Sequence, residues 1–380
     1  MPRSISLLEL RRYAVIRSLF KPTTLGRAIS KLGFVQADPI RAPARAQDLT
    51  LRHRVIGYHA GDLERRYPKL AVEEDVFVNY GFLPSAHHAL MHPRVPGSWN
   101  AVTRKRANAL LAYVREHGAV HPRQVDEHFD HGSVRNYWGG SSNATSQLLE
   151  AMHYHSLLRV VRRDDGIRIY AERSQQPLAE EVLSRDLIDR LVDIVVMKYA
   201  PLPAATLSGL VYRLRYAAPH LSAERKGALA RAKARLANAR IDGIEWCWPG
   251  DEPVRAKPDA RYDEARFLCP FDPVVWDRRR FELFWGWAYR FEAYTPAPRR
   301  KLGYYALPLL WRDEVIGWGN LALRDRRLDA EIGFVDGRTP APELRAALRR
   351  ELERMGDFLR AAGVGRLVVG QRKSEVGSRK

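Results

Sequence analysis

Gln36 and Asp38 are the two residues of this chain whose types and spacing could do chemistry. They lie two positions apart, and Pro39 biases the preceding backbone towards an extended conformation, so both side chains are expected on one face. An amide and a carboxylate side by side can hold and activate a water molecule. Arg41 and Arg45 follow closely enough to meet a phosphate. In a chain of formal net charge +19, this group favours chemistry on nucleic acid over binding alone.

The composition is that of a folded, strongly basic protein. A length of 380 residues is too great for one compact core, and a hydrophobic fraction of 46% excludes a disordered chain. The 63 Lys and Arg residues against 44 Asp and Glu indicate a polyanionic partner, DNA or RNA; a genome that enriches arginine everywhere is the less favoured explanation. The two cysteines have no metal-ligand spacing. With neither a signal-peptide core nor a long apolar stretch, we expect a cytoplasmic protein that does not associate with membranes.

Hydrophobic periodicity predicts three helix-rich segments, each ending in basic or hairpin-like residues. The first has helices at 7–20 and 25–32, an extended stretch at 34–38, and a helix carrying Arg41, Arg45 and Arg52. The second has helices at 103–117, 123–129 and 145–158 and a hairpin with its turn at 165–166. The third has helices at 185–199, 204–212 and 222–238 and a hairpin with its turn at 249–251. Helices followed by a basic hairpin are the order of a winged helix, a helix-turn-helix variant. Residues 57–99 remain unassigned.

Beyond residue 260 the pattern changes to strands, at 304–311, 314–323 and 327–335, before a helix at 341–362. We therefore predict an α+β chain of tandem winged-helix units followed by a small C-terminal antiparallel β-barrel. The predicted domains are a winged-helix unit with the Gln36/Asp38 motif (1–100), two further winged-helix units (101–175 and 176–258), a β-barrel domain with a C-terminal helix (259–370) and a disordered tail (371–380).

Further candidate DNA contacts lie outside the first segment. Ser142 and Asn143 stand at the start of a helix, where backbone amides favour a phosphate, although an ordinary N-cap explains them equally well. The other candidates are basic residues: Arg52, Arg162, Arg163, Arg278 and Arg279.

Two more clusters are candidate sites. The acidic and basic block at 272–280 is better explained as a brace between segments than as a catalytic group, and the aromatic run at 276–289 is better explained as core. His88 and His92 have the i, i+4 spacing of metal ligands, and His87 adjoins them. With no carboxylate or cysteine at suitable spacing nearby, we predict no metal and no cofactor.

Several motifs resemble those of a known family. Gln36-Ala37-Asp38 matches a hallmark of Gln, an apolar residue, then Asp or Gln, and the blocks at 270–280, 289–296 and 301–308 are more specific still. The family is that of the bacterial winged-helix DNA glycosylases that unhook interstrand crosslinks (YcaQ/AlkZ-like). The chain departs from it at Gln47, where relatives often have His, and at 79–87, where many have Tyr-Trp-Ala-His. On spacing alone, Gln36 and Asp38 are better explained as polar caps of the turn at Pro39; the resemblance reverses that preference.

The resemblance implies three tandem winged helices with a C-terminal β-barrel, and a monofunctional, metal-independent DNA glycosylase acting in DNA repair. Asp38 would stabilise positive charge on the sugar and act as general base, and Gln36 would orient the attacking water. The implied partner is double-stranded DNA with alkylated or crosslinked guanine, bound by a monomer. The alternative is a non-enzymatic winged-helix transcriptional regulator. A nuclease is disfavoured because the sequence offers no carboxylate cluster suited to two metal ions.

Overall fold

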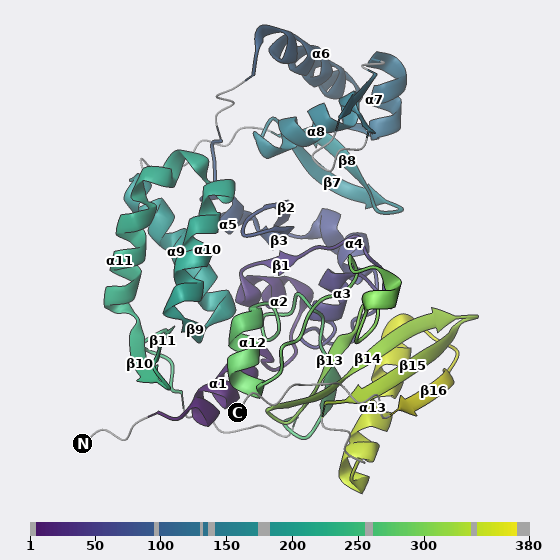
Figure 1. The fold of residues 1–380 in the computed structure, drawn as a ribbon. Helices are drawn as coiled ribbons and strands as arrows, with labels where there is room; N and C mark the ends of the chain where they lie inside the picture. Colours follow the sequence, from purple (N-terminus) through teal and green to yellow (C-terminus); the bar gives the residue numbers. More distant parts are fainter. Residues whose placement is uncertain are drawn as a thin grey trace. The chain divides into compact units, whose positions relative to one another are not determined.

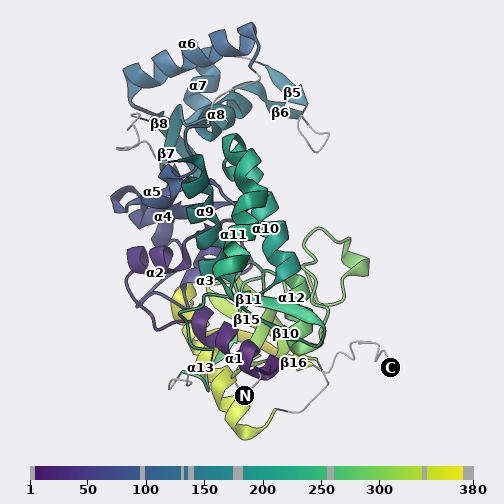
Figure 2. The ribbon, with the colours of Figure 1, turned by 90° about the vertical axis from the view of Figure 1, so that its left-hand side faces the viewer.

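The computed structural model describes residues 5–94, 99–129, 132–135, 141–173, 183–254, 261–335 and 340–370, without the side chains of 134, 135, 141, 142 and 370. The chain divides into two compact units. Unit 1 comprises Met1–Asp62, Val195–Gly209 and Lys233–Lys380, and unit 2 comprises Leu63–Ile194 and Leu210–Ala232. Each is described by itself below, with its elements labelled in Figure 1 and seen from a second side in Figure 2.

Unit 1 begins with helices whose ends the sequence specifies. Helix α1 (Leu7–Ser18) starts at a capping box, in which Ser6 and Glu9 satisfy each other's backbone N–H groups. Helix α2 (Leu25–Leu32) ends at Gly33, whose φ of +70° suits glycine. Strand β1 (Val35–Gln36) follows, so both helices and the extended stretch are confirmed.

The predicted helix with three arginines is wrong. Helix α3 (Ala46–Leu51) contains none of them: Arg41 lies in the preceding loop, Arg45 is the N-cap and Arg52 is the C-cap. Pro39 and Pro43 explain the difference, because proline removes a backbone donor and restricts the residue before it. The segment that carries Asp38 is therefore a loop between β1 and α3.

The C-terminal part of unit 1 is a five-stranded sheet in the order β12-β13-β14-β15-β16. Its strands are β12 (Ala265–Phe267), β13 (Leu307–Trp311), β14 (Glu314–Arg324), β15 (Arg327–Phe334) and β16 (Val364–Gly370). The first three pairings are antiparallel, but β15 and β16 run parallel. Helix α13 (Pro342–Leu359) connects those two strands, and a crossover of this kind returns the chain in the same direction.

These strands correct the predicted antiparallel barrel. Among the described strands the order is linear, so the sheet is open, and its last pairing makes it mixed. Strands β13, β14 and β15 and helix α13 were predicted from their periodicity, whereas β12 and β16 were not. The predicted disordered tail at 371–380 lies outside the described residues.

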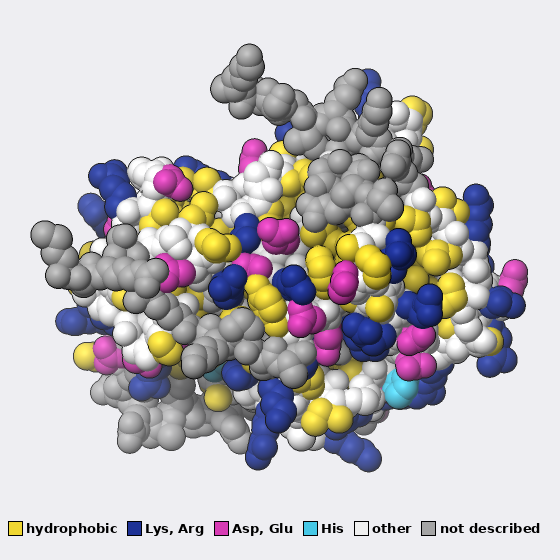
Figure 3. Space-filling model, turned by 90° about the horizontal axis from the view of Figure 1, so that it is seen from below, with side chains coloured by type: hydrophobic (Ala, Val, Ile, Leu, Met, Phe, Trp, Pro, Cys, Tyr) yellow, Lys and Arg dark blue, Asp and Glu magenta, His cyan; other side chains and the backbone are white. Residues whose placement is uncertain are grey.

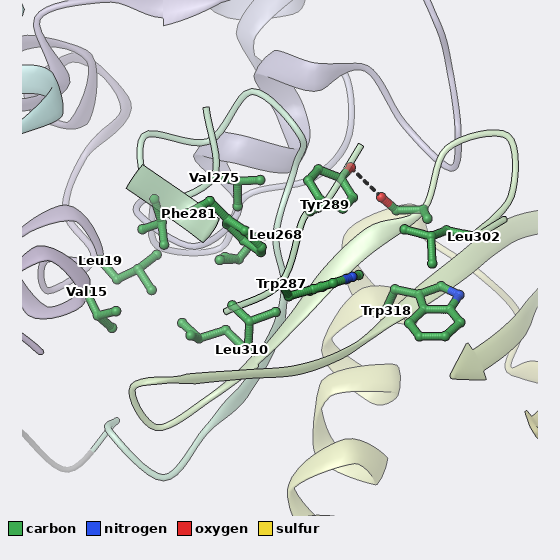
Figure 4. Packing of buried hydrophobic residues seen from close by; sticks show 13 residues of the cluster. Val15, Leu19, Leu268, Val275, Phe281, Trp287, Tyr289, Leu302, Leu310 and Trp318 are labelled. Atoms are coloured by element: carbon green, nitrogen blue, oxygen red, sulfur yellow. Dashed lines mark hydrogen bonds between the residues drawn. The ribbon is translucent and has the colours of Figure 1, made fainter. Parts of the chain in front are cut away.

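The first helix and the last sheet of unit 1 share one core. Val15 of α1 and its C-cap Leu19 belong to the same buried cluster as Phe281 and Leu310, and Figure 4 shows these four side chains near one another, with Trp318 at the other end of the cluster. Phe281 belongs to α12 (Arg278–Trp285). Each fully buried side chain of this size contributes about 1.5–3 kcal/mol. The prediction that the aromatic run belongs to the core is confirmed for its buried members: Phe281, Phe284, Trp287 and Tyr289.

A second, small sheet in unit 1 corrects one predicted turn. Strands β10 (Ala237–Ile241) and β11 (Ile244–Trp248) form a hairpin, and β11 also pairs with β9 (Leu202–Pro203). The turn is Asp242-Gly243, with φ of +48° and +75°, rather than the predicted 249–251. Asp-Gly accepts positive φ at both central positions and favours the two-residue hairpin.

Unit 2 contains the predicted second set of helices and hairpin. Helices α6 (Ala101–His117), α7 (Pro122–Phe129) and α8 (Ala144–Tyr154) lie beside strands β7 (Leu158–Asp164) and β8 (Ile167–Glu172) in Figures 1 and 2. The hairpin turns at Asp165-Gly166, as predicted. Short strands flank these helices: β4 (Ala119–Val120), β5 (Ser133–Arg135) and β6 (Ser141–Asn143).

The stretch left unassigned at 57–99 forms short elements, mostly in unit 2. They are α4 (Asp62–Arg66), η1 (Tyr67–Lys69), β2 (Val72–Val76), β3 (Tyr80–Pro84) and α5 (Ser85–Ala89). The remaining elements of the chain are α9 (Ser184–Tyr199), α10 (Ala204–Ala217), η2 (Pro219–Glu224), α11 (Arg225–Arg235) and η3 (Ala297–Arg299). No helix among the described residues is both long and apolar enough to cross a lipid bilayer.

Candidate active site

Gln36 is held in one orientation by an aromatic residue far along the chain. Gln36 is the last residue of β1 and is 9% exposed. The Nε1–H of Trp276 donates a hydrogen bond to Gln36 Oε1 at 2.9 Å. An indole nitrogen only donates, so the amide atom that faces it is the oxygen. The ring of Trp276 in turn packs against Tyr199, with ring centres 4.8 Å apart. Trp276 therefore fixes which end of the Gln36 amide faces the interior.

Asp38 lies in the loop after β1 and is half-buried. Its Oδ1 accepts a hydrogen bond from the backbone N–H of Ile40 at 2.9 Å, so the turn-capping explanation is confirmed for this oxygen. Burial raises the pKa of Asp38, while the Ile40 N–H opposes the shift. Capping occupies one oxygen, and the raised pKa makes the carboxylate a better proton acceptor than an exposed aspartate.

Two tyrosines lie close enough to Asp38 for its charge to shift their pKa values. Burial, and then the Asp38 carboxylate, raise the pKa of Tyr294. Burial and Cys269 raise the pKa of Tyr305, and Asp38 adds to that rise. The Tyr294 side chain is 80% exposed. An exposed ring beside a carboxylate is a surface on which a nucleic-acid base can stack.

An open groove borders the same loop. It has a volume of about 590 Å³, and Ala42 of the loop lines it together with Tyr304 and Tyr305. Its other walls come from β14, β15 and β16 and carry both signs of charge: Arg324, Arg366, Asp329 and Glu331. Arg41, one of the predicted phosphate contacts, is exposed on this loop. The site thus has room for a nucleotide next to the Asp38 loop.

Gln47, a position at which the chain departs from the family pattern, contacts the candidate site directly. Gln47 Oε1 lies 3.5 Å from the backbone nitrogen of Asp38 and accepts from it. The next residue, Asp48, is buried and accepts from the hydroxyl of Tyr58 at 2.7 Å. Burial raises the pKa of Asp48, and the charge of Arg45 lowers it. Arg45 therefore interacts electrostatically with Asp48, in addition to its predicted role towards phosphate.

The block at 272–280 acts as a brace, as predicted. Arg54 donates two hydrogen bonds to Asp272, at 2.7 and 3.0 Å, and both side chains are fully buried. The same guanidinium also donates to the backbone carbonyls of Ser18 and Thr50. This pair ties the loop before α12 to the N-terminal helices of unit 1.

Three candidate DNA contacts are committed to other partners. Arg52 pairs with buried Glu351 at 2.9 Å, and Arg163 pairs with buried Glu74. Arg278 donates to the carbonyl of Val275, and its guanidinium lies 4.7 Å from the ring centre of Tyr289. We therefore assign Arg52 and Arg163 structural roles, because a buried carboxylate already pairs with each guanidinium. Arg278 is half-buried, and its contacts with Val275 and Tyr289 hold it within unit 1.

The remaining candidates stay open to solvent or act as caps. Arg279 is exposed, and Arg162 is half-exposed beside Asp164 at 3.1 Å. Asn143 caps α8 by accepting from the backbone N–H of Ser146 at 2.9 Å, which is the ordinary N-cap explanation. Ser142 lies in β6, and its side chain is outside the described part.

Sequence reasoning missed Trp276, Tyr294 and Tyr305 as neighbours of the motif, since they lie more than 230 residues away in the chain. The aromatic run and the specific blocks around it were the available signal. The basic charge gives no further guidance on the face in Figure 3, where Lys and Arg side chains are interspersed with acidic and apolar ones.

Comparison with known proteins gives two matches. The family model described as DNA glycosylase AlkZ-like matches residues 29–358. The solved structure of Streptomyces sahachiroi DNA glycosylase AlkZ superposes with a TM-score of 0.61 and 13% sequence identity, over 97% of this chain and 100% of that one. At that identity the superposition shows a shared mixed α+β fold, while the family model covers most of the chain. This protein therefore belongs to the AlkZ-like DNA glycosylase family.

Proposed function

We propose that this DNA glycosylase hydrolyses the N-glycosidic bond of cationic N7-alkylated guanine, including guanine in interstrand crosslinks, through Gln36 and Asp38. The observation that carries the proposal is the pairing of an amide oriented by Trp276 with a half-buried carboxylate two residues later, beside an open groove. The proposal includes the tandem winged-helix arrangement, a monomer, and a monofunctional reaction without a metal ion.

The chemistry needs little from the protein because the leaving group is already activated. Alkylation at N7 makes the purine cationic, so the C1′–N9 bond breaks with its electron pair going to the base. The Asp38 carboxylate would stabilise the positive charge that develops on the sugar. A water molecule oriented by the Gln36 amide would add to C1′ and give its proton to Asp38. The raised pKa of Asp38 supports this role as a base.

An open groove suits a crosslinked substrate. A base tethered to the opposite strand cannot swing fully out of the duplex into an enclosed pocket. The groove beside Ala42 is open and lined partly by Tyr304 and Tyr305, which leaves space for the tether. This supports crosslink unhooking as part of the proposed activity.

The experiment compares four proteins on duplex DNA containing N7-methylguanine. They are the wild type, Asp38→Asn, Asp38→Asn with Gln36→Ala, and the control Asp325→Asn. Asp325 lies exposed in the β14–β15 turn at φ +45°, a conformation that asparagine tolerates, so the control removes the same charge elsewhere. We expect base release by the wild type and control, and none by the double variant, with equal DNA binding.

Base release that persists in the double variant would refute the assignment of the two residues. A wild type that releases no base but protects a specific sequence of undamaged DNA would favour the regulator alternative instead. The same assay on a nitrogen-mustard crosslink tests whether unhooking belongs to the activity.

A further inference from the structure

Three side chains that can ligate a metal ion converge in unit 2. None of them is a residue of the candidate active site. Asp75 lies in β2, His88 in α5, and His92 three residues after that helix. Their Oδ2, Nε2 and Nε2 atoms form a triangle with sides of 3.0, 3.1 and 3.0 Å. We propose that Asp75, His88 and His92 bind one divalent transition-metal ion of the zinc type.

The triangle brings three acceptor atoms together. A neutral imidazole Nε2 carries either one proton or one lone pair, and the oxygens of an ionised carboxylate carry only lone pairs. If both Nε2 atoms carried protons, the two hydrogens would face each other across the 3.0 Å contact between the histidines. If one were bare, its lone pair would face the Asp75 oxygen at 3.0 or 3.1 Å. A cation bound to all three atoms removes both conflicts.

The dimensions and chemistry of the group suit zinc. Zn²⁺ binds His nitrogen and carboxylate oxygen at about 2.0–2.2 Å, and tetrahedral angles at these distances place neighbouring ligand atoms roughly 3.3–3.6 Å apart. The three sides of 3.0–3.1 Å are a few tenths of an ångström shorter, so small side-chain shifts would admit the ion. His88 and His92 have the i, i+4 spacing that puts two imidazoles on one side of a helical turn. Imidazole favours transition metals over Mg²⁺ and Ca²⁺, which prefer oxygen ligands.

The surroundings hold the ligands in place. The Ser156 Oγ lies 2.7 Å from His92 Nδ1, and a partner on Nδ1 fixes the ring orientation and leaves Nε2 for a metal. Arg94 Nη1 donates to both oxygens of Asp75, at 2.9 and 3.1 Å. Each carboxylate oxygen has a second lone pair, so Asp75 can serve Arg94 and a cation together. The Arg94 charge also weakens the attraction for the cation, which limits the affinity of the site.

A further buried histidine, His153, interacts with this group of ligands. His153 is buried in α8, and its Nε2 has no hydrogen-bond partner among the described residues. It interacts electrostatically with Asp75, although it is outside the group of three atoms that lie within ligand distance. Arg173 is the other charged group whose field reaches both His88 and His92. The side chains of Asp75, His88 and His92 are 1%, 5% and 12% exposed, so a bound ion would be largely buried.

This proposal differs from the expectation drawn from the sequence. The spacing of His88 and His92 was recognised, but no nearby carboxylate was found because Asp75 lies 13 residues earlier, in a strand. The fold brings it to the histidines. All three ligands belong to unit 2, whereas Gln36 and Asp38 belong to unit 1. We assign the proposed ion a structural role because no step of the proposed reaction uses it.

The test measures metal binding and uses no activity. The full chain is stripped with a chelator and dialysed, then titrated with Co²⁺ and with Zn²⁺ by calorimetry, and bound metal is quantified by elemental analysis. We expect one equivalent per chain and a higher Tm with Zn²⁺, because a ligand bound only by the folded state stabilises it. X-ray absorption of the Zn²⁺ form should show two histidines in a shell of N and O ligands at about 2.0 Å.

Variants identify the ligands. His92→Gln changes the least buried of the three and should abolish stoichiometric binding, whereas His87→Gln, the neighbouring histidine outside the triangle, should bind as the wild type does. A wild-type chain that binds less than one equivalent, or an absorption spectrum without histidine, would overturn the proposal even if a variant fails to fold. Equal binding by His92→Gln and the wild type would overturn it as well.

Discussion

Trp276→Phe tests whether the orientation of the Gln36 amide matters for the reaction. The substitution keeps an aromatic ring and removes the Nε1–H that donates to Gln36 Oε1 at 2.9 Å. A neutral hydrogen bond of this kind is worth about 0.5–1.5 kcal/mol net, which corresponds to a roughly 2- to 13-fold slower reaction if it is needed in the transition state. Removing the amide itself, with Gln36→Ala, should cost more, about 10²–10³-fold, as for other donors of preorganised sites.

The assay is single-turnover release of N7-methylguanine with enzyme in excess over DNA, so that product release does not limit the rate. Trp285→Phe is the matched control: Trp285 is also half-buried, and its Nε1–H donates to the carbonyl of Asp313 at 2.9 Å, away from Gln36. Both variants lose the same atoms and a similar hydrogen bond. If Trp276→Phe reacts as fast as Trp285→Phe while the wild type is active, then Trp276 does not position the amide.

Four further predictions concern stability and pH. Asp272→Asn leaves the buried Arg54 guanidinium without its counter-charge, so the free energy of unfolding in urea should fall by about 3–5 kcal/mol; a loss under about 1 kcal/mol would mean that water reaches the pair. Asn143→Ala removes the N-cap of α8 and should lower that free energy by about 1 kcal/mol, whereas an unchanged value would exclude a capping role. The acidic limb of the single-turnover pH–rate profile should have its midpoint above pH 3.8, the ordinary pKa of an aspartate. Burial raises the pKa of Asp38, and only its ionised form accepts a proton. A midpoint at or below pH 3.8 would contradict this assignment. The pKa of Asp38 is higher in the folded state than in the unfolded state. Its contribution to the free energy of unfolding is therefore complete below the unfolded pKa and is lost as pH rises through the folded pKa. Over that rise the free energy of unfolding of Asp38→Asn should increase relative to that of the wild type.

Local signals predicted the elements whose ends depend on nearby residues. The capping pair Ser6/Glu9, Gly33 after α2 and the Asp165-Gly166 turn all act within a few residues, and the two helices and the hairpin that they delimit were predicted. The turn at 242–243 was missed although it too is Asp-Gly, because the Pro-Gly-Asp sequence at 249–251 gave a competing turn signal. Strand β16 was missed because its parallel partner depends on where α13 delivers the chain.

The candidate site was predictable only in part, for the same physical reason. Gln36 and Asp38 lie two positions apart in sequence, so their types and spacing could be assessed directly. The ion pairs of Arg52 with Glu351 and of Arg163 with Glu74 depend on tertiary packing, which periodicity does not reveal. A basic side chain in the sequence therefore indicates a possible phosphate contact, and only its partner in the fold decides whether its charge remains available.

The shared core of α1 and the C-terminal sheet has a consequence for synthesis on the ribosome. Val15 and Leu19 emerge early, but Leu310 and Trp318 of the same cluster follow about 300 residues later. At about 5–20 residues per second, these side chains of the first helix must wait roughly 15–60 s for the rest of their core. During that interval the nascent chain exposes them, so its first twenty residues offer an apolar surface to a ribosome-associated chaperone.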